Sequence, residues 1–430
     1  MKSTLALFRQ PAAANQILLQ AAALTVLGVG FSALLGFPQS KDVRLYQRYG
    51  ALVLQGSVPY RDFDVEYPPL ALLPMVLAQV PDGKSASAYG GYAHRFFSLN
   101  VLFAILTAVA IGRAASADAL EGRAAAVLRT FALLVAVFSP LFPWRYDPFP
   151  AALTALALAA FAEKSFFAAG VWTGLGVAAK LYPVLILAVF GLHCLCRRRI
   201  EDVGRLTAGA VVALLAVFLP VVLLADGKAF SFLEFHQQRG IEIGSVPAGL
   251  LLLGHAIGAA PVQLVYSFGA DHLVSPAADR LRDLLAPISV AAIGVALWRA
   301  RTWMVRAWAT RGAIDARTTA TATFFVLLVA MATGKVLSPQ FMVWLLPFIP
   351  FLPRGPRVLA VAVCGATILI FPFGWSAMVQ LRLPLILLLN LRNAAMVALA
   401  VWLWKRPTEP EEVVLPAGGS GTAAPVGARA

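Results

Sequence analysis

The stretch 206–225, LTAGAVVALLAVFLPVVLLA, decides the fold class of this chain. It contains no charged residue, and about 20 apolar residues are enough to cross the hydrocarbon core of a bilayer. Segments 16–36 and 383–404 are comparably long and apolar. Of the 430 residues, 60% are hydrophobic and 13% charged, and the mean hydropathy is +0.78. A soluble domain cannot keep so much apolar surface out of water, so the sequence predicts an integral membrane protein.

Similar segments recur along the chain and predict an all-α, polytopic membrane protein with about 12 transmembrane helices. The expected spans are 16–36, 95–113, 125–141, 149–163, 166–178, 181–196, 206–225, 281–299, 318–333, 339–353, 357–373 and 383–404. They form one membrane domain, residues 1–406. Residues 407–430 are rich in Pro, Gly and Ala without periodicity, and we expect them to form a disordered cytoplasmic tail.

The net charge of +14 is explained by this topology. With the N-terminus inside, the inner segments carry most of the excess Lys and Arg, including the runs 197–199 and 299–317. Cationic inner loops are what the positive-inside rule expects. The sequence therefore predicts a multi-pass protein of the plasma (cell) membrane with cytoplasmic N- and C-termini, and no nucleic-acid partner is needed to explain the charge.

Two of the predicted outer loops are large. Outer loop one, residues 37–94, contains apolar patches at 45–54 and 70–80 that are too short to span and suit interfacial helices. Outer loop two, residues 226–280, contains the longer apolar stretch 247–266. We expect that stretch to be re-entrant or interfacial, because a full span would invert the charge pattern of the loops that follow.

Several ionisable residues lie, by this topology, near the outer ends of the helices. A charge at the bilayer centre costs on the order of 2.5–3.5 kcal/mol, yet Lys180 and Lys335 are both embedded in apolar sequence. Either lysine alone is explained by snorkelling to the headgroups. Because Arg239, His236 and several carboxylates lie on the same side, a shared polar cavity is the better interpretation. Arg392 is near mid-span, and we expect it to pair with a neighbouring helix instead.

Such a cavity suits the transfer of a group from a lipid phosphate. The departing phosphate needs cationic stabilisation more than it needs a general acid. The acceptor hydroxyl is a poor nucleophile and needs a carboxylate base, which nearby cations would keep ionised. One aspartate facing several Lys, Arg or His side chains is the minimum set for this chemistry.

At these positions the sequence also resembles a known family, the GT-C glycosyltransferases. The segments DVRLY (42–46), GSVPY (56–60) and FDVEYPPL (63–70) resemble the first outer loop of one branch. That branch is the polyprenyl-phosphate-mannose-dependent α-mannosyltransferases (glycosyltransferase family 87, the DUF2029 domain). Further similar segments follow in the family's order: DPFP (147–150), GVAAKLYP (176–183), RGIEIGS (239–245) and KVLSPQFMVWLLP (335–347). The chain departs from the family at Glu242, because related sequences often place the acid two residues later.

The resemblance implies an inverting hexosyltransferase of the cell envelope. It would move a sugar, mannose before arabinofuranose, from a polyprenyl-phosphate donor to a lipid-linked or glycan acceptor at the outer face of the membrane. Asp42 would be the catalytic base, whereas the alternative is an aspartate that caps an interfacial helix. The candidates for binding the donor phosphate are Lys180, Arg239, Lys335 and His236. The candidates for other substrate contacts are Tyr46, Asp62, Glu66, Tyr67, Asp147, Tyr182 and Gln340.

The segment Asp62-Phe-Asp64 spells an Asp-x-Asp, which elsewhere holds metal-bound nucleotide sugars. Nucleotide sugars are not normally available on the outer face, so we expect a role in ordering the loop or contacting the acceptor. The sequence shows no His-x-x-x-His or other metal-ligand spacing. We therefore expect no cofactor, and dependence on a divalent metal stays open.

The alternative function is a secondary transporter or flippase of a lipid-linked or small polar substrate, because about 12 helices is also a common transporter count. Transporters place coupling charges near the midplane, on interrupted helices in two related halves. In this sequence only Arg392 is that deep, and no related halves are evident. A non-catalytic assembly partner is a third possibility.

Overall fold

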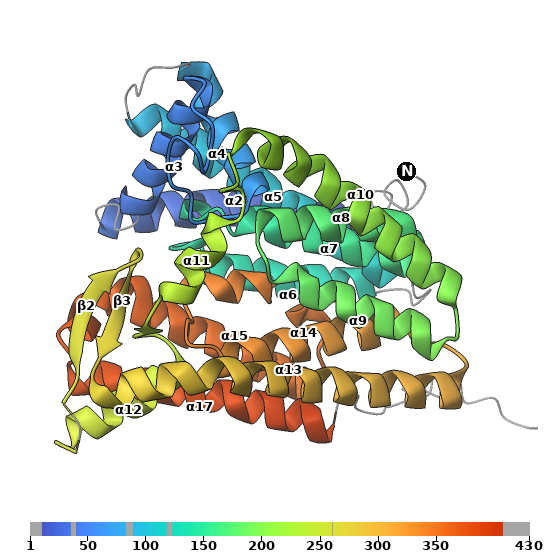
Figure 1. Cartoon of the computed structure of the whole chain (residues 1–430). Helices are drawn as coiled ribbons and strands as arrows, with labels where there is room; N and C mark the ends of the chain where they lie inside the picture. Colours follow the sequence, from blue (N-terminus) through green and yellow to red (C-terminus); the bar gives the residue numbers. More distant parts are fainter. Residues whose placement is uncertain (1–10, 36–39, 83–88, 118–122, 260, 407–430) are drawn as a thin grey trace, which may run out of the picture.

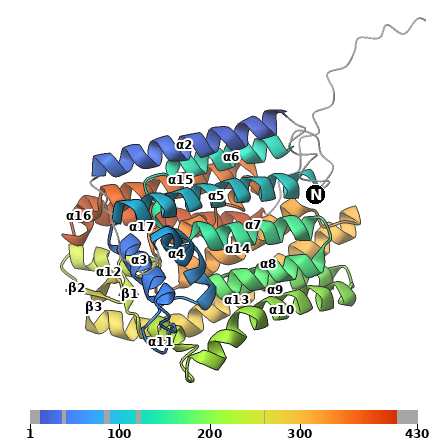
Figure 2. The same cartoon turned by 90° about the horizontal axis from the view of Figure 1, so that it is seen from above.

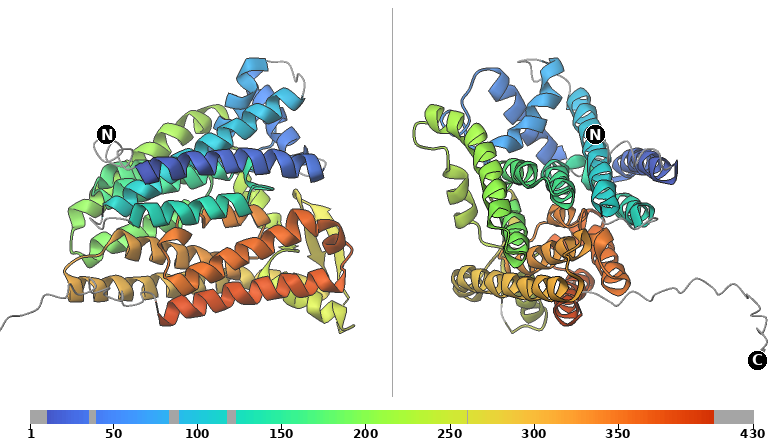
Figure 3. Two further views of the ribbon diagram at one scale, coloured as in Figure 1. Left: turned by 180° about the vertical axis from the view of Figure 1, so that it is seen from behind. Right: turned by 90° about the vertical axis from the view of Figure 1, so that its right-hand side faces the viewer.

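The structure is a computed structural model, which describes residues 11–35, 40–82, 89–117, 123–259 and 261–406. The predicted tail, 407–430, lies outside the described residues. The long helices run roughly parallel (Figure 1) and are seen nearly end-on in the right-hand view of Figure 3. One end of this bundle carries short helices and a small sheet, and we call it the loop end. The opposite end, where α9 turns into α10, is called the turn end.

Seven helices of the described residues are long and apolar enough to cross a membrane. They are α2 (Pro11–Leu35), α5 (Tyr89–Ser116), α10 (Ile200–Leu224), α13 (Pro276–Arg311), α14 (Ala316–Thr333), α15 (Arg354–Ile368) with the π-helical η6 (Leu369–Phe373), and α17 (Leu383–Lys405). Large apolar side chains such as Leu215, Leu219 and Leu223 of α10 are exposed. Contiguous apolar surface of this kind requires lipid around it, so the protein is a membrane protein.

Four predicted spans correspond to shorter apolar helices, which run alongside the long ones (Figure 2). These are α6 (Arg123–Val137), α7 (Pro148–Ala162), α8 (Phe166–Ala179) and α9 (Pro183–Cys196). A helix of this length rises only about 22 Å, whereas the hydrocarbon core is about 30 Å thick. By length and composition, seven of the expected spans are therefore full-length helices.

The predicted span at 339–353 is wrong as a helix. This segment consists of two short 3-10 turns, η4 (Pro339–Trp344) and η5 (Ile349–Phe351). The physical reason is proline at 339, 347, 350 and 353, since each proline removes a backbone donor and clashes with the preceding turn. Irregular backbone at membrane depth is tolerated where protein surrounds it or where it lines a cavity, and the second half of η4 and all of η5 are buried. Arg317 Nε donates to the Phe351 carbonyl at 3.2 Å, which satisfies one freed acceptor.

Helices α8 and α10 pack with almost no side chain between them. The spacing Gly170-x-x-x-Gly174 predicts such a close approach, and the structure confirms it. A Cβ atom at Gly170 would overlap the Leu206 carbonyl oxygen, and one at Gly174 would lie 2.6 Å from the Ala210 carbonyl oxygen. Gly209 meets α8 in the same way from the other side. Packing therefore accounts for these glycines.

We expect Gly170→Ala to destabilise the protein by about 1–3 kcal/mol, because the added methyl must push α10 away. The measurement is the thermal midpoint of unfolding in detergent. Gly204→Ala is the matched control, since a Cβ atom at Gly204 meets nothing within 4 Å. Equal midpoints for the two variants would contradict the packing argument.

Outer loop one forms the short helices expected from its two apolar patches. They are α3 (Ser40–Leu54), η1 (Pro69–Ala71) and α4 (Leu72–Gln79), followed by η2 (Val80–Asp82). Pro69 is the first residue of η1. Proline suits this position because N–H groups in the first turn of a helix have no acceptor within the helix. Tyr60, Tyr92 and Phe96 are buried in the cluster beneath these helices. Loop one is thus a packed layer on the bundle.

Outer loop two contains a sheet that the all-α prediction did not include. Its elements are α11 (Ser231–Gln238), β1 (Ile241–Glu242), α12 (Val246–Ala256), β2 (Gln263–Ser267) and β3 (Ala270–Val274). The strands are antiparallel in the order β1-β3-β2. The stretch 247–266 divides into α12 and β2, so it is not a single span. Phe268 and Gly269, with φ of 49° and 71°, form the two-residue turn between β2 and β3.

Polar residues of α17 hold the start of α12. Arg392 Nη2 donates to the Gly244 carbonyl at 2.6 Å, and Asn393 Nδ2 donates to the Ser245 carbonyl at 3.1 Å. Asn390 Nδ2 donates to the Gly249 carbonyl at 3.0 Å. Arg392 therefore contacts the turn that precedes α12, whereas the sequence predicted a contact with a neighbouring helix. The remaining short elements are η3 (Phe142–Trp144) and α16 (Trp375–Val379).

Candidate functional site

A cavity of about 650 Å³ opens at the loop end and collects residues from positions 41 to 344. Most of the predicted site residues line it: Asp42, Glu66, Tyr67, Lys180, Tyr182, His236, Arg239, Lys335 and Gln340. They come from outer loop one, the α8–α9 connection, outer loop two and the segment after α14. The shared polar cavity expected from the topology is therefore present at one end of the bundle.

Asp42 lies in the first turn of α3 and forms an ion pair with Arg145. The Asp42 side chain is 34% exposed, whereas that of Arg145 is only 7% exposed. Burial lowers the pKa of Arg145 to about 10, although the nearby Asp147 opposes this effect. The guanidinium therefore stays charged at neutral pH and fixes the Asp42 carboxylate at the cavity wall. Arg145 was not among the predicted site residues, although it lies two positions before Asp147.

Asp147 fixes the position of the Lys180 side chain. Its Nζ donates to Asp147 Oδ1 at 2.6 Å, and the same oxygen accepts from Trp344 Nε1 at 2.7 Å. Burial lowers the pKa of Lys180, and the Asp147 charge acts in the opposite direction. Asp147 is 1% exposed and does not line the cavity. It was predicted as a substrate contact, but it lies behind the cavity and positions Lys180.

A second charged group joins outer loop two to the segment after α14. Arg239 Nη2 lies 3.6 Å from Glu242 Oε2, and Ser338 Oγ donates to Glu242 Oε1 at 2.6 Å. Burial raises the pKa of Glu242, against the opposing effect of Arg239. Lys335 Nζ donates to the Gln237 carbonyl at 2.7 Å. Arg239 and Lys335 are thus held in fixed positions at the cavity wall.

His236 also lines the cavity, but it is not a cation at neutral pH. Burial lowers its pKa to about 4, and the positive charges of Arg239, Lys180 and Lys335 act in the same direction. As a neutral ring it can still donate one hydrogen bond. His236 was predicted to help bind the donor phosphate. As a neutral ring it can do so by donating a hydrogen bond, but not through a positive charge.

This pKa has a consequence for stability against pH. The folded value of about 4 lies below the ordinary 6.5, so the unfolded chain binds the proton more readily between these values. Stability is therefore fully present above the ordinary pKa and is lost as the pH falls toward the folded one. We expect the drop in thermal midpoint between about pH 7 and about pH 5 to be smaller in His236→Gln than in the unchanged protein. His94→Gln is the control. If the thermal midpoint depends on pH in the same way in both variants, the prediction is contradicted.

The tyrosines and acids of loop one divide into cavity and supporting residues. Glu66 and Tyr67 line the cavity, and burial raises the pKa of Glu66 against a hydrogen bond from Tyr67. Tyr46 does not line the cavity, because it is buried against Tyr67 and the ring of Tyr146. Asp62 also lies outside the cavity. It accepts from Val58 N at 2.7 Å and so orders its own loop, one of the two roles expected for it.

No protein-family model and no curated protein matches this chain. The assignment of function therefore rests on the residues of the site.

Several lining residues were missed by the sequence interpretation. They are Lys41, Leu45, Tyr49, Tyr146, Leu181, Phe235, Tyr266, Phe268, Phe341 and Trp344. In the sequence, an aromatic residue that lines a cavity cannot be distinguished from one that is packed in the core, because both lie in apolar segments. The β2–β3 hairpin was missed as well, although Gly269 in an alternating stretch is a recognisable turn signal.

The cavity is both cationic and aromatic. Among the described residues, its lining carries four cations (Lys41, Lys180, Arg239 and Lys335) and two carboxylates (Asp42 and Glu66). This excess attracts an anionic ligand. On one wall, the ring of Trp344 stacks on those of Phe341 and Tyr182, with centroid distances of 4.0 and 4.4 Å. The arrangement suits a ligand with an anionic group and a larger body that packs on aromatic rings.

Proposed function

We propose that this protein is an inverting glycosyltransferase of the GT-C type. It moves a sugar, mannose first of all, from a polyprenyl-phosphate donor to a lipid-linked or glycan acceptor. The observation that carries this proposal is the loop-end cavity. It is lined both by the carboxylates of Asp42 and Glu66 and by the cationic side chains of Lys180, Arg239 and Lys335. The resemblance of the lining segments to the polyprenyl-phosphate-mannose-dependent enzymes supports the choice of donor.

Asp42 supplies the base in this proposal. The acceptor oxygen attacks the anomeric carbon, the bond from that carbon to the phosphate oxygen breaks, and the phosphate leaves with the electron pair. The acceptor proton passes to the Asp42 carboxylate. Arg145 holds that carboxylate in place through their ion pair, which reduces the cost of orienting the base.

The three cations stabilise the leaving phosphate. Each is fixed before substrate arrives: Lys180 by Asp147, Arg239 by Glu242, and Lys335 by the Gln237 carbonyl. Charges that are already oriented stabilise the developing negative charge without reorganising at the moment of reaction. In this proposal Glu66 and Tyr67, which line the cavity, contact sugar hydroxyls, and the aromatic wall receives the sugar ring.

The loop end faces the outside of the plasma membrane in this proposal. The turn end carries Arg197, Arg198 and Arg199 between α9 and α10, as well as Arg301 and Arg306 on α13. The positive-inside rule assigns such an end to the cytoplasm. The donor then reaches the cavity from the outer leaflet.

The proposal is tested with membranes that contain the protein, incubated with radiolabelled polyprenyl-phosphate mannose. We expect a labelled lipid-linked or glycan product that forms far more slowly with Asp42→Asn membranes. Uptake of label into sealed vesicles without product would favour the transporter instead. Product formation with polyprenyl-phosphate arabinofuranose alone would keep the reaction class and change the sugar.

A further inference from the structure

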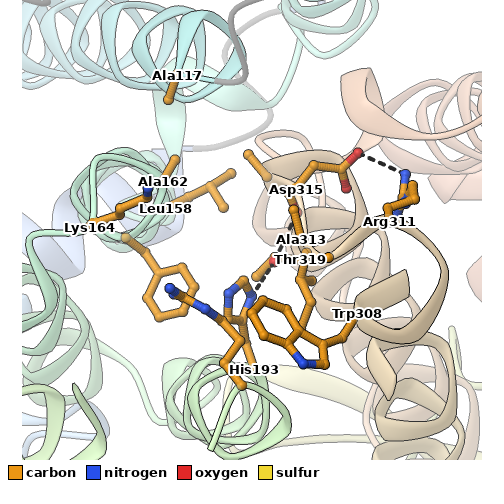
Figure 4. A pocket seen from close by; sticks show the side chains of 15 residues that line it. Ala117, Leu158, Ala162, Lys164, His193, Trp308, Arg311, Ala313, Asp315 and Thr319 are labelled. Carbon is orange, nitrogen blue, oxygen red and sulfur yellow. Dashed lines mark hydrogen bonds and ion pairs between the residues drawn. The ribbon is translucent and has the colours of Figure 1, made fainter. Parts of the chain in front are cut away.

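A second cavity, of about 490 Å³, lies at the turn end and shares no lining residue with the first. Its walls come from the α7–α8 turn, the end of α9 and the α13–α14 junction (Figure 4). Leu158, Phe161 and Ile314 supply apolar surface, whereas Lys164, Arg197 and Arg311 supply charge. Nothing in the proposed transfer reaction uses this cavity.

The cavity has more positive than negative charge. Among the residues that the structure describes, the single carboxylate that lines it is Asp315, whose Oδ1 accepts from Thr318 N at 2.8 Å and so caps α14. Asp315 Oδ2 also pairs with Arg311 Nη1 at 3.3 Å. Within the described ranges, neither Lys164 nor Arg197 forms an ion pair. Two cations are therefore left to face the cavity without a protein anion.

A buried histidine in the cavity wall has an unused ring nitrogen. His193 is 5% exposed, and its Nδ1 lies 2.8 Å from Thr319 Oγ1, as Figure 4 shows. The Thr319 hydroxyl also lies 3.1 Å from the Asp315 carbonyl, which can accept from it. His193 Nε2 has no hydrogen-bond partner among the residues that the structure describes. A polar ring nitrogen in this position indicates a ligand with a group that can form a hydrogen bond to it.

We propose that the turn-end cavity binds a phosphate group attached to a hydroxyl-bearing body. Lys164 and Arg197 bind the phosphate, His193 Nε2 forms a hydrogen bond with the hydroxyl, and Leu158 and Ile314 pack against the alkyl part. Basic pockets between the ends of membrane helices are where anionic headgroups bind, and the guanidinium fork matches phosphate oxygens. The same chemistry is offered by the headgroup of an anionic phospholipid and by a soluble glycerol phosphate.

The test uses the purified full-length protein in neutral detergent. It is titrated with phosphatidylglycerol, phosphatidylcholine and glycerol 3-phosphate, and binding is read by thermal midpoint and by native mass spectrometry. The double variant Lys164→Gln/Arg197→Gln removes the two unpaired cations. We expect its affinity to fall about fivefold for each cation removed. The control Arg198→Gln/Arg306→Gln removes two exposed cations at the same end that do not line the cavity, and we expect it to bind as the unchanged protein does.

The outcomes separate the two sources of phosphate. Binding of phosphatidylglycerol but not of glycerol 3-phosphate identifies a lipid headgroup site, and binding of both identifies a site for soluble phosphate compounds. Equal binding by phosphatidylcholine, or full binding by the double variant, overturns the proposal. Native mass spectrometry counts bound ligand directly, so a change in the stability of the variant does not obscure the result.

Discussion

Asp42→Asn is expected to lower the rate of sugar transfer by a factor of about 10²–10⁴, the usual contribution of a general base. Asparagine has the same size and keeps an oxygen that can accept from Arg145, but it cannot take up the acceptor proton. The folded protein is therefore expected to accumulate in the membrane at its normal level. The measurement is the initial rate of product formation by purified protein, together with the thermal midpoint.

Two further variants make this result specific. Asp62→Asn changes an aspartate of the same loop that lies outside the cavity, and we expect it to transfer sugar at close to the normal rate. Glu66→Gln changes the other carboxylate that lines the cavity. If Asp42→Asn stays active while Glu66→Gln does not, the base is Glu66 and the role of Asp42 is structural.

Asp147→Ala is expected to reduce the stability of the protein by about 3–5 kcal/mol, the usual cost of removing one partner of a buried ion pair. The substitution leaves Lys180 Nζ and Trp344 Nε1 without their common acceptor. The lysine side chain is only 14% exposed, so water replaces the lost partner poorly. The effect is measured as the fall in thermal midpoint in detergent.

Asp147→Asn is the matched control. It keeps an oxygen for both donors and loses only the charge, so we expect a smaller fall in the midpoint than with alanine. Equal midpoints for the alanine variant and the unchanged protein would show that Asp147 does not hold Lys180. Transfer is expected to fall in both variants, because the lysine is no longer fixed beside the phosphate.

The charged ends of the helices were predictable from local sequence. Lys180 follows α8 directly and Lys335 follows α14 within two residues, so the end of each apolar segment fixes the depth of its charge. The pairings were not predictable in the same way. Asp147 lies 33 positions from Lys180 and 197 positions from Trp344, and no local pattern links residues so far apart.

The departures from the predicted fold also depend on contacts between segments that are far apart in the sequence. The segment 339–353 is as apolar as a span, although its prolines exclude a regular helix. Such an irregular backbone can be buried only where other parts of the protein surround it. The sheet of outer loop two depends on pairing β1 with β3, which are separated by α12. Apolar composition alone does not distinguish these arrangements from helices.

The sequence by itself determined that this is a membrane protein, where its long helices lie, and that its costly charges gather near one end. It could do so because crossing a bilayer is a local demand on length and polarity. Only the tertiary structure decided which residues share the loop-end cavity, and that Arg145 holds Asp42 while Asp147 stands behind Lys180. Those relations depend on how the helices pack side by side, which sets the neighbours of each buried charge and therefore its chemistry.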